Sequence, residues 1–167
     1  MCRVPPQFAH LLKLRNMEKT RIFEVTEFRN DYLDAVNRLL KQLSTHAAAI
    51  GKDDLEAIIA CGASHLFLLE YGGRIAGMAT VCLYRCPTGM KAWIEDLVVD
   101  SGSRGHGLGL MLTEHASDFA ENLGNVTLML TSRPSRLIAN SMYRSAGFVK
   151  RETNVYRKQP GHGVKVK

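Results

Sequence analysis

Three glycines at alternate positions follow Arg104, in the segment Arg104-Gly105-His106-Gly107-Leu108-Gly109. Glycine lets the backbone come close to a bound group, and the unpartnered N–H groups at the start of a helix attract negative charge. Because a strongly amphipathic segment follows, this loop is a candidate phosphate or pyrophosphate site. A Walker loop would need a lysine after its last glycine, and a dinucleotide fingerprint would need a third glycine where Met111-Leu112 stands. A glycine-rich turn without a ligand is the alternative.

Alternating strand and helix patterns surround this loop and must position it. Strands are expected at residues 21–28, 66–71, 74–81, 92–99 and 126–130, with a terminal hairpin from 148–149 and 154–156. Helices are expected at residues 31–43, 53–59, 108–123 and 134–146. Gly72-Gly73 predicts a tight turn between two strands, since both positions can adopt a positive φ. The order of elements, without repeats or a linker, predicts one domain of mixed α and β structure.

Strand alternation decides which side chains of residues 92–99 face the same side of the sheet. In a regular strand, Trp93, Glu95, Leu97 and Val99 share one face, and Asp96 belongs to the other. A β-bulge between them would reverse that relation.

Composition and charge exclude several classes of function. The chain has 167 residues, 46% hydrophobic and 23% charged, which suits a folded domain rather than a disordered chain. The net charge of +6 arises at the two ends, because residues 1–21 carry five Lys/Arg and one acid, and residues 144–167 carry seven and one. Since the body between them is net negative, we expect no nucleic-acid partner. No apolar stretch is long enough to span a membrane.

The cysteines suggest neither a metal site nor a redox pair. They stand at four positions without a CxxC motif or paired Cys/His spacing: Cys2, Cys61, Cys82 and Cys86. Zinc is therefore not expected, and reduced, mostly buried thiols fit an intracellular protein.

Two motifs together resemble the GNAT superfamily of acyl-CoA-dependent N-acyltransferases. One is Arg104-x-x-Gly107-x-Gly109 after Leu97-Val98-Val99-Asp100, and the other is Asn140-x-x-Tyr143-x-x-x-Gly147-Phe148. The resemblance extends over the element order from about Thr20 to Tyr156. It implies a mixed, mostly antiparallel sheet of six or seven strands flanked by about four helices. It also implies that acetyl-CoA lies where the fourth and fifth strands splay apart.

The resemblance assigns roles to residues around that cleft. The backbone amides of Arg104, Gly105, His106, Gly107, Leu108 and Gly109 would hold the CoA pyrophosphate. The backbone of Leu97, Val98 and Val99 would pair with the pantetheine arm, and one amide there would polarise the thioester carbonyl. Asn140 would bind the pantetheine or position the tyrosine.

Acid and base roles follow from the same resemblance. Tyr143 is at the family's usual position for the general acid, and its alternative is a packing tyrosine. Glu95 is at the position of the base or of a residue that relays the proton through water, and an ion pair that stabilises the fold is the alternative. Asp96 is the second candidate for the base. No nucleophilic Ser or Cys with a partnered His is evident, so direct transfer is expected.

Arg133 and Arg136 lie outside the two motifs, and the resemblance assigns them no role. They could clamp the 3′-phosphate of CoA or a carboxylate of the substrate, or they could be solvated residues at the start of a helix.

The function expected is direct transfer of an acetyl group from acetyl-CoA to a primary amine of a small molecule, a peptide or a protein. A non-catalytic acyl-CoA sensor of the same fold is the alternative. The boundaries expected are a disordered extension at 1–16, the acetyltransferase domain at 17–158 and a flexible basic tail at 159–167. No metal is expected, the location expected is cytoplasmic, and a homodimer is left open.

Overall fold

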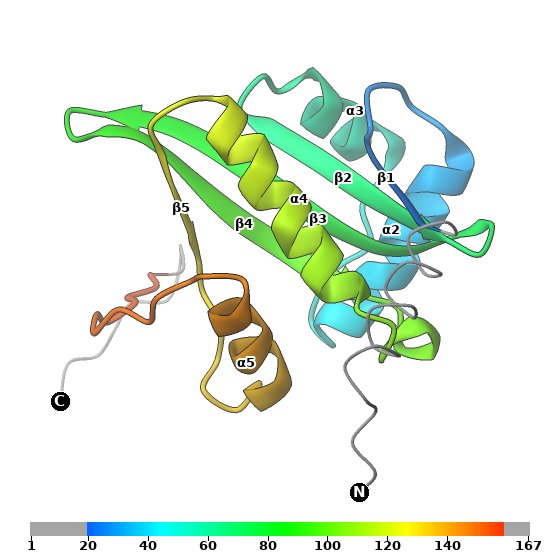
Figure 1. Ribbon diagram of the computed structural model, residues 1–167. Helices are drawn as coiled ribbons and strands as arrows, with labels where there is room; N and C mark the ends of the chain where they lie inside the picture. The colour runs from blue at the N-terminus through cyan, green and yellow to red at the C-terminus, as the bar shows by residue number, and fades with distance from the viewer. Residues whose placement is uncertain (1–19, 159–167) are drawn as a thin grey trace, which may run out of the picture.

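The computed structural model describes residues 20–158, so the extension and the tail expected at the two ends lie outside the described residues. The chain forms a mixed α+β sheet with helices on both faces (Figure 1). Its strands are β1 (Thr20–Glu24), β2 (Ser64–Tyr71), β3 (Arg74–Cys86), β4 (Gly89–Val99) and β5 (Val126–Leu130). Its helices are α2 (Asn30–Leu43), α3 (Lys52–Ala60), the short η1 (Ser101–Ser103), α4 (Leu108–Asn122) and α5 (Leu137–Ser145).

The five strands lie in chain order, β1-β2-β3-β4-β5. The first four pair antiparallel, whereas β4 and β5 pair in parallel, from Met90 opposite Val126 to Ile94 opposite Leu130. The parallel pair requires a crossover, and α4 provides it across one face of the sheet (Figure 1).

Two hydrophobic cores lie on opposite faces of the sheet. On one face, Leu108, Leu112 and Ala116 of α4 pack against the strands. On the other, Val36 and Leu39 of α2 pack with Leu55 of α3. Strand β2, between β1 and β3, contributes to both cores, since Phe67 and Leu69 belong to the α4 core while Leu66 and Leu68 belong to the α2–α3 core. Burial on both faces explains why this strand reads as a continuous apolar run.

A β-bulge in β4 changes which residues face each core. Thr80 of β3 lies opposite Glu95, and Met78 lies opposite Val98, so β4 has one residue more than β3 in this interval. Asp96, with φ of 51°, occupies the left-handed region at this point. Residues of β4 after Asp96 therefore face the side of the sheet opposite to the one that regular alternation predicts.

The expectation that Glu95 shares a face with Leu97 and Val99 is wrong. Leu97 and Val99 pack against the α4 core, whereas Val98 belongs to the α2–α3 core. Because Ile94 also belongs to the α4 core, its neighbour Glu95 lies on the face covered by α2 and α3.

The sheet has fewer strands than the six or seven expected. Residues 148–158 form neither strand of the expected terminal hairpin. Val149, Val155 and Tyr156 keep 75–89% of their surface exposed. A two-stranded hairpin needs a packed apolar face for its stability, and these side chains have none here. Among the described residues, no helix is long and apolar enough to cross a membrane.

Candidate active site

The glycine-rich loop leads directly into α4. Gly105 and Gly107 have φ of 81° and 78°, a left-handed conformation that side chains with a Cβ rarely adopt. Gly107 is the N-cap of α4, and no side chain caps the helix there. The first amides of α4 are therefore available to an anion that binds in the loop.

Gly109 has a different physical role from Gly107. It has an ordinary helical φ, but a Cβ on it would lie 3.1 Å from Sδ of Met142 in α5 and 3.8 Å from Cγ2 of Val99. No atom lies within 4 Å of a Cβ placed on Gly107. Gly109 therefore lets α5 pack closely against α4, and Gly107 provides the backbone turn.

Asp100 fastens the start of this loop to α2 and β3. Its side chain is 10% exposed and forms ion pairs with Arg38 of α2 and, at 3.8 Å, with Arg74 of β3. It also accepts a hydrogen bond from the Gly102 amide at 3.0 Å. Burial alone would raise the pKa of Asp100, but the Gly102 amide and the Arg38 guanidinium hold it below its ordinary value.

Asp100→Asn is expected to lower the free energy of unfolding by about 1–3 kcal/mol at pH 7, because hydrogen bonds to a charged group are lost. A lowered carboxyl pKa stabilises the fold above the unfolded value of about 4, and this stabilisation disappears as the pH falls through the folded pKa. Urea unfolding of both proteins from pH 7 to pH 3 should therefore show the difference between them shrinking toward acid. A difference that stays constant over this range would contradict the role given to Asp100.

The C-terminal half of β4 has an open edge. Strand β5 pairs with β4 only as far as Ile94, so residues 95–99 have no strand partner on that side within the described part of the chain. Leu97, Val98 and Val99, expected to pair with an acyl-CoA arm, all lie on this edge. The structure thus leaves backbone groups of β4 accessible beside the glycine-rich loop.

Glu95 lines a cavity of about 410 Å³ together with Cys82, Trp93, Thr131 and Val155. We call this the carboxylate cavity. Much of the surface of Glu95 and Asp96 is exposed to solvent. The protein around Glu95 nevertheless removes part of its hydration, which raises its pKa, and the negative charge of Asp96 raises that pKa further. Burial raises the pKa of Asp96 as well. A carboxylate with a raised pKa is a better proton acceptor at neutral pH than an ordinary one.

Tyr143 and Asn140 both come from α5. Tyr143 is half-buried, and its ring lies edge-on to Phe148 with centroids 6.1 Å apart. Burial raises the pKa of its hydroxyl, and the nearby Arg136 offsets part of that rise. Asn140 donates from Nδ2 to the carbonyl oxygen of Arg133 at 2.9 Å, so it holds the loop between β5 and α5. Glu95 and Tyr143 form no hydrogen bond with each other.

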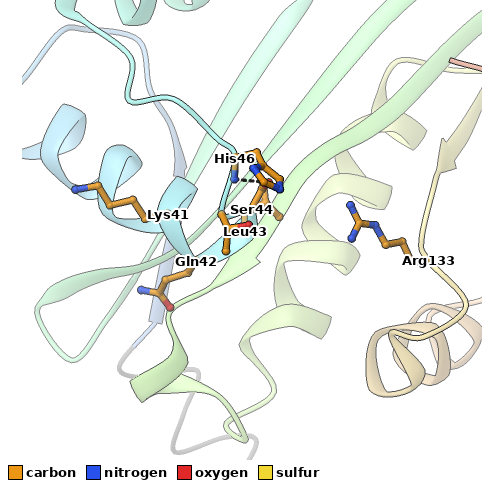
Figure 2. Close-up of a pocket in the computed structure, with 7 residues that line it drawn as sticks. Lys41, Gln42, Leu43, Ser44, His46 and Arg133 are labelled. Carbon is orange, nitrogen blue, oxygen red and sulfur yellow. Dashed lines mark hydrogen bonds between the residues drawn. The ribbon is translucent and has the colours of Figure 1, made fainter. Parts of the chain in front are cut away.

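A second cavity, of about 370 Å³, lies between the end of α2 and the loop after β5. Its walls include Lys41, Ser44 and His46 from the end of α2 and the turn after it, and Arg133 from the β5–α5 loop (Figure 2). We call it the cationic pocket. Of these residues, sequence reasoning singled out only Arg133, because no local motif marks Lys41, Ser44 or His46.

No group of three His, Cys, Asp or Glu side chains close enough to hold a metal ion occurs among residues 20–158.

Comparisons with known proteins point to one family. Residues 27–148 match the model of the acetyltransferase (GNAT) family. Glucosamine 6-phosphate N-acetyltransferase 1 of Oryza sativa subsp. japonica is 26% identical over 145 residues, which are 82% of this chain and 84% of that protein. The [ribosomal protein bS18]-alanine N-acetyltransferase of Salmonella typhimurium is 38% identical over 74 residues, 43% of this chain and 50% of that protein.

A solved structure has the same fold. An aminoglycoside acetyltransferase from an uncultured soil metagenomic sample, in complex with sisomicin, aligns with a TM-score of 0.76. It is 17% identical, and the alignment covers 86% of this chain and 97% of that one. With the family model spanning most of the described residues, the chain belongs to the acetyltransferase (GNAT) family and is an acetyl-CoA-dependent N-acetyltransferase.

Proposed function

We propose that the protein transfers an acetyl group directly from acetyl-CoA to a primary amine of a small molecule, a peptide or a protein. The observation that carries this proposal is the uncapped start of α4 at Gly107, next to the open edge of β4. The first can bind a pyrophosphate, and the second can pair with an extended arm. Glu95 and Tyr143 then supply the two proton-transfer groups that the reaction needs.

The residues that bind the donor are backbone groups. In the proposal, amides from Arg104 to Gly109 hold the pyrophosphate of acetyl-CoA, and the exposed edge of Leu97–Val99 pairs with its pantetheine arm. An amide of this edge polarises the thioester carbonyl, and such a pre-aligned donor typically contributes 10²–10³ in rate.

The chemical step requires two proton transfers. The amine must be neutral to attack the thioester carbonyl carbon, so Glu95 accepts its proton directly or through water. The new C–N bond forms as the C–S bond breaks, and Tyr143 donates a proton to the departing CoA thiolate. The Tyr143 hydroxyl is protonated at neutral pH, since burial raises its pKa above the ordinary value of about 10.

The proposal does not specify which amine accepts the acetyl group. The relatives named above act on an amino sugar phosphate and on an alanine of a ribosomal protein, so both small molecules and proteins are acceptors among proteins similar to this chain. A cytoplasmic location and a homodimer likewise stay predictions.

Release of free CoA thiol from acetyl-CoA in the presence of a panel of primary amines tests the proposal directly. Acetyl-CoA turnover that depends on an added amine supports it. Binding of acetyl-CoA without turnover for every amine would favour the acyl-CoA sensor instead.

Gly107→Val is expected to abolish the stabilisation of the protein by acetyl-CoA. A ligand that binds only the native state raises Tm, and a β-branched residue cannot readily adopt φ of 78° at the N-cap. The measurement is the Tm shift at millimolar acetyl-CoA. Gly89→Val is the control for backbone strain, because Gly89 also has a positive φ of 111° but lies in the distant β3–β4 turn. An undiminished shift in Gly107→Val would show that the loop does not bind the donor.

A further inference from the structure

The cationic pocket is lined by residues from two distant parts of the chain, and Arg133 directs its positive side chain into it. Lys41 and His46 come from the end of α2 and the turn after it, and the Arg133 side chain extends toward Ser44 and His46 from the loop after β5 (Figure 2). The hydroxyl groups of Ser44 and Thr45 complete the wall, and no Asp or Glu is among the described residues that line it. Cations and hydroxyl groups without a carboxylate are the donor set that binds an oxyanion.

The loop that presents Arg133 is held in place by its own hydrogen bonds. The carbonyl oxygen of Arg133 accepts from the Arg136 amide at 3.0 Å and from Nδ2 of Asn140 at 2.9 Å. Nη2 of Arg136 donates to the carbonyl oxygen of Leu43 at 3.4 Å, which ties the loop to the end of α2. The backbone of Arg133 is therefore fixed at the pocket, and its guanidinium remains available to a ligand.

No ion pair within residues 20–158 explains the charges of Lys41 and Arg133. Arg38 of the same helix forms an ion pair with Asp100, whereas Lys41 and Arg133 form no ion pair within residues 20–158. Lys41 can compensate the negative end of the α2 dipole, which amounts to about half an elementary charge. Arg133 adds a full positive charge from another element, so the pocket keeps an excess of positive charge.

The cationic pocket adjoins the carboxylate cavity through the same loop. Thr131 lines the cavity that contains Glu95, and Arg133 lines the cationic pocket. Two residues of extended chain span at most about 7 Å. The two cavities are therefore lined by the same short segment of the β5–α5 loop.

We propose that the amine acceptor carries an oxyanion group, a phosphate or a carboxylate, and that the cationic pocket binds this group. The proposal rests on the proposed acetyltransfer and narrows its acceptor class. Among amines compatible with the fold, polyamines and aminoglycosides are then poor acceptors, because their additional positive charges meet the guanidinium of Arg133. The 3′-phosphate of CoA is the other source of the same chemistry, but no residue of the Arg104–Gly109 loop lines this pocket.

Matched pairs of amines test the proposal. Glucosamine 6-phosphate is compared with glucosamine, and an α-amino acid with its α-amide, by CoA thiol release from acetyl-CoA. In at least one pair, the anionic member should have a KM lower by about 10- to 100-fold, the effect of one charge-assisted hydrogen bond. Arg133→Ala should remove most of that difference and leave the KM of the uncharged member nearly unchanged.

Arg85→Ala is the matched control. It changes the net charge by the same amount, and Arg85 is an exposed residue near the β3–β4 turn, outside both cavities. It should leave the preference for the anionic amine intact. An equal loss in Arg85→Ala would show a general charge effect and overturn the proposal.

Two further results would overturn the assignment of the pocket to the acceptor. One is that the anionic and the uncharged amine have equal KM values in both matched pairs. The other is an Arg133→Ala variant that raises the KM for acetyl-CoA but not for 3′-dephospho-acetyl-CoA, which would assign the pocket to the donor.

If no amine releases thiol, the proposed function fails, and binding still tests the pocket. An anionic amine should raise the Tm of the parent protein but not of Arg133→Ala. Equal Tm shifts in the two proteins would overturn the site.

Discussion

Tyr143→Phe is expected to lower kcat by about 10²- to 10⁴-fold, the usual contribution of an acid–base group, with little change in the affinity for acetyl-CoA. Phenylalanine keeps the half-buried ring and its edge-on contact with Phe148, so only the proton donor is lost. The hydroxyl makes no hydrogen bond to another described residue, so its removal leaves no buried partner unsatisfied. Steady-state kinetics with a direct binding measurement for acetyl-CoA separate loss of transition-state stabilisation from loss of binding.

Tyr32→Phe provides the control for the chemical change itself. Tyr32 lies on α2, where its ring packs against Phe23 with centroids 5.5 Å apart, and it takes no part in the proposed reaction. This variant should keep the parent kcat. Equal kcat values in Tyr143→Phe and the parent, with chemistry shown to limit the rate, would reduce Tyr143 to a packing residue.

The features that the sequence predicted well are those that depend on local patterns. The glycine-rich loop was recognisable because the conformations at Gly105 and Gly107 require glycine whatever packs around them. The Gly72-Gly73 turn was recognisable for the same reason, and both residues have positive φ. Strand β2 and helix α4 were visible from their apolar patterns alone.

The bulge in β4 shows where local patterns fail. Asp96 adopts φ of 51° although it is not glycine, so no glycine in the sequence indicated the bulge at this position. The extra residue is defined only by the pairing with β3, in which Thr80 and Met78 lie opposite Glu95 and Val98. Regular alternation therefore placed Leu97 and Val99 on the wrong face relative to Glu95.

The cationic pocket could not be assembled from the sequence either. Leu43 and Arg136, which join its two walls, are 93 residues apart in the chain. The sequence marked Arg133 and Arg136 as candidates to bind a phosphate or a carboxylate, but Lys41, Ser44 and His46 belong to no motif. Only the packing of the β5–α5 loop against the end of α2 brings these side chains together.

Glu95→Gln is expected to lower kcat/KM by about 10²- to 10⁴-fold and to flatten its decrease toward acidic pH. In the parent, a base must be ionised, so kcat/KM falls as the pH drops through the pKa of Glu95. Burial and the charge of Asp96 raise that pKa, so the decrease begins at a higher pH than for an ordinary glutamate. Because a raised carboxyl pKa destabilises the fold at neutral pH, the glutamine variant should not have a lower Tm than the parent. A loss of activity with a lowered Tm would instead indicate unfolding.

Asp96→Asn distinguishes the two carboxylates as the base. Asparagine tolerates the left-handed backbone at this position as well as aspartate does, so the bulge should persist. If Glu95 is the base, removing the neighbouring charge lowers the pKa of Glu95 and moves the acidic decrease of kcat/KM to lower pH, with activity at neutral pH largely kept. If Asp96 is the base, the same variant loses activity by the factor expected for Glu95→Gln, and Glu95→Gln shows only a displaced pH profile. The bulge places these two side chains next to each other at one irregular point of β4, so the pH profiles of both variants are needed to decide which carboxylate takes the proton.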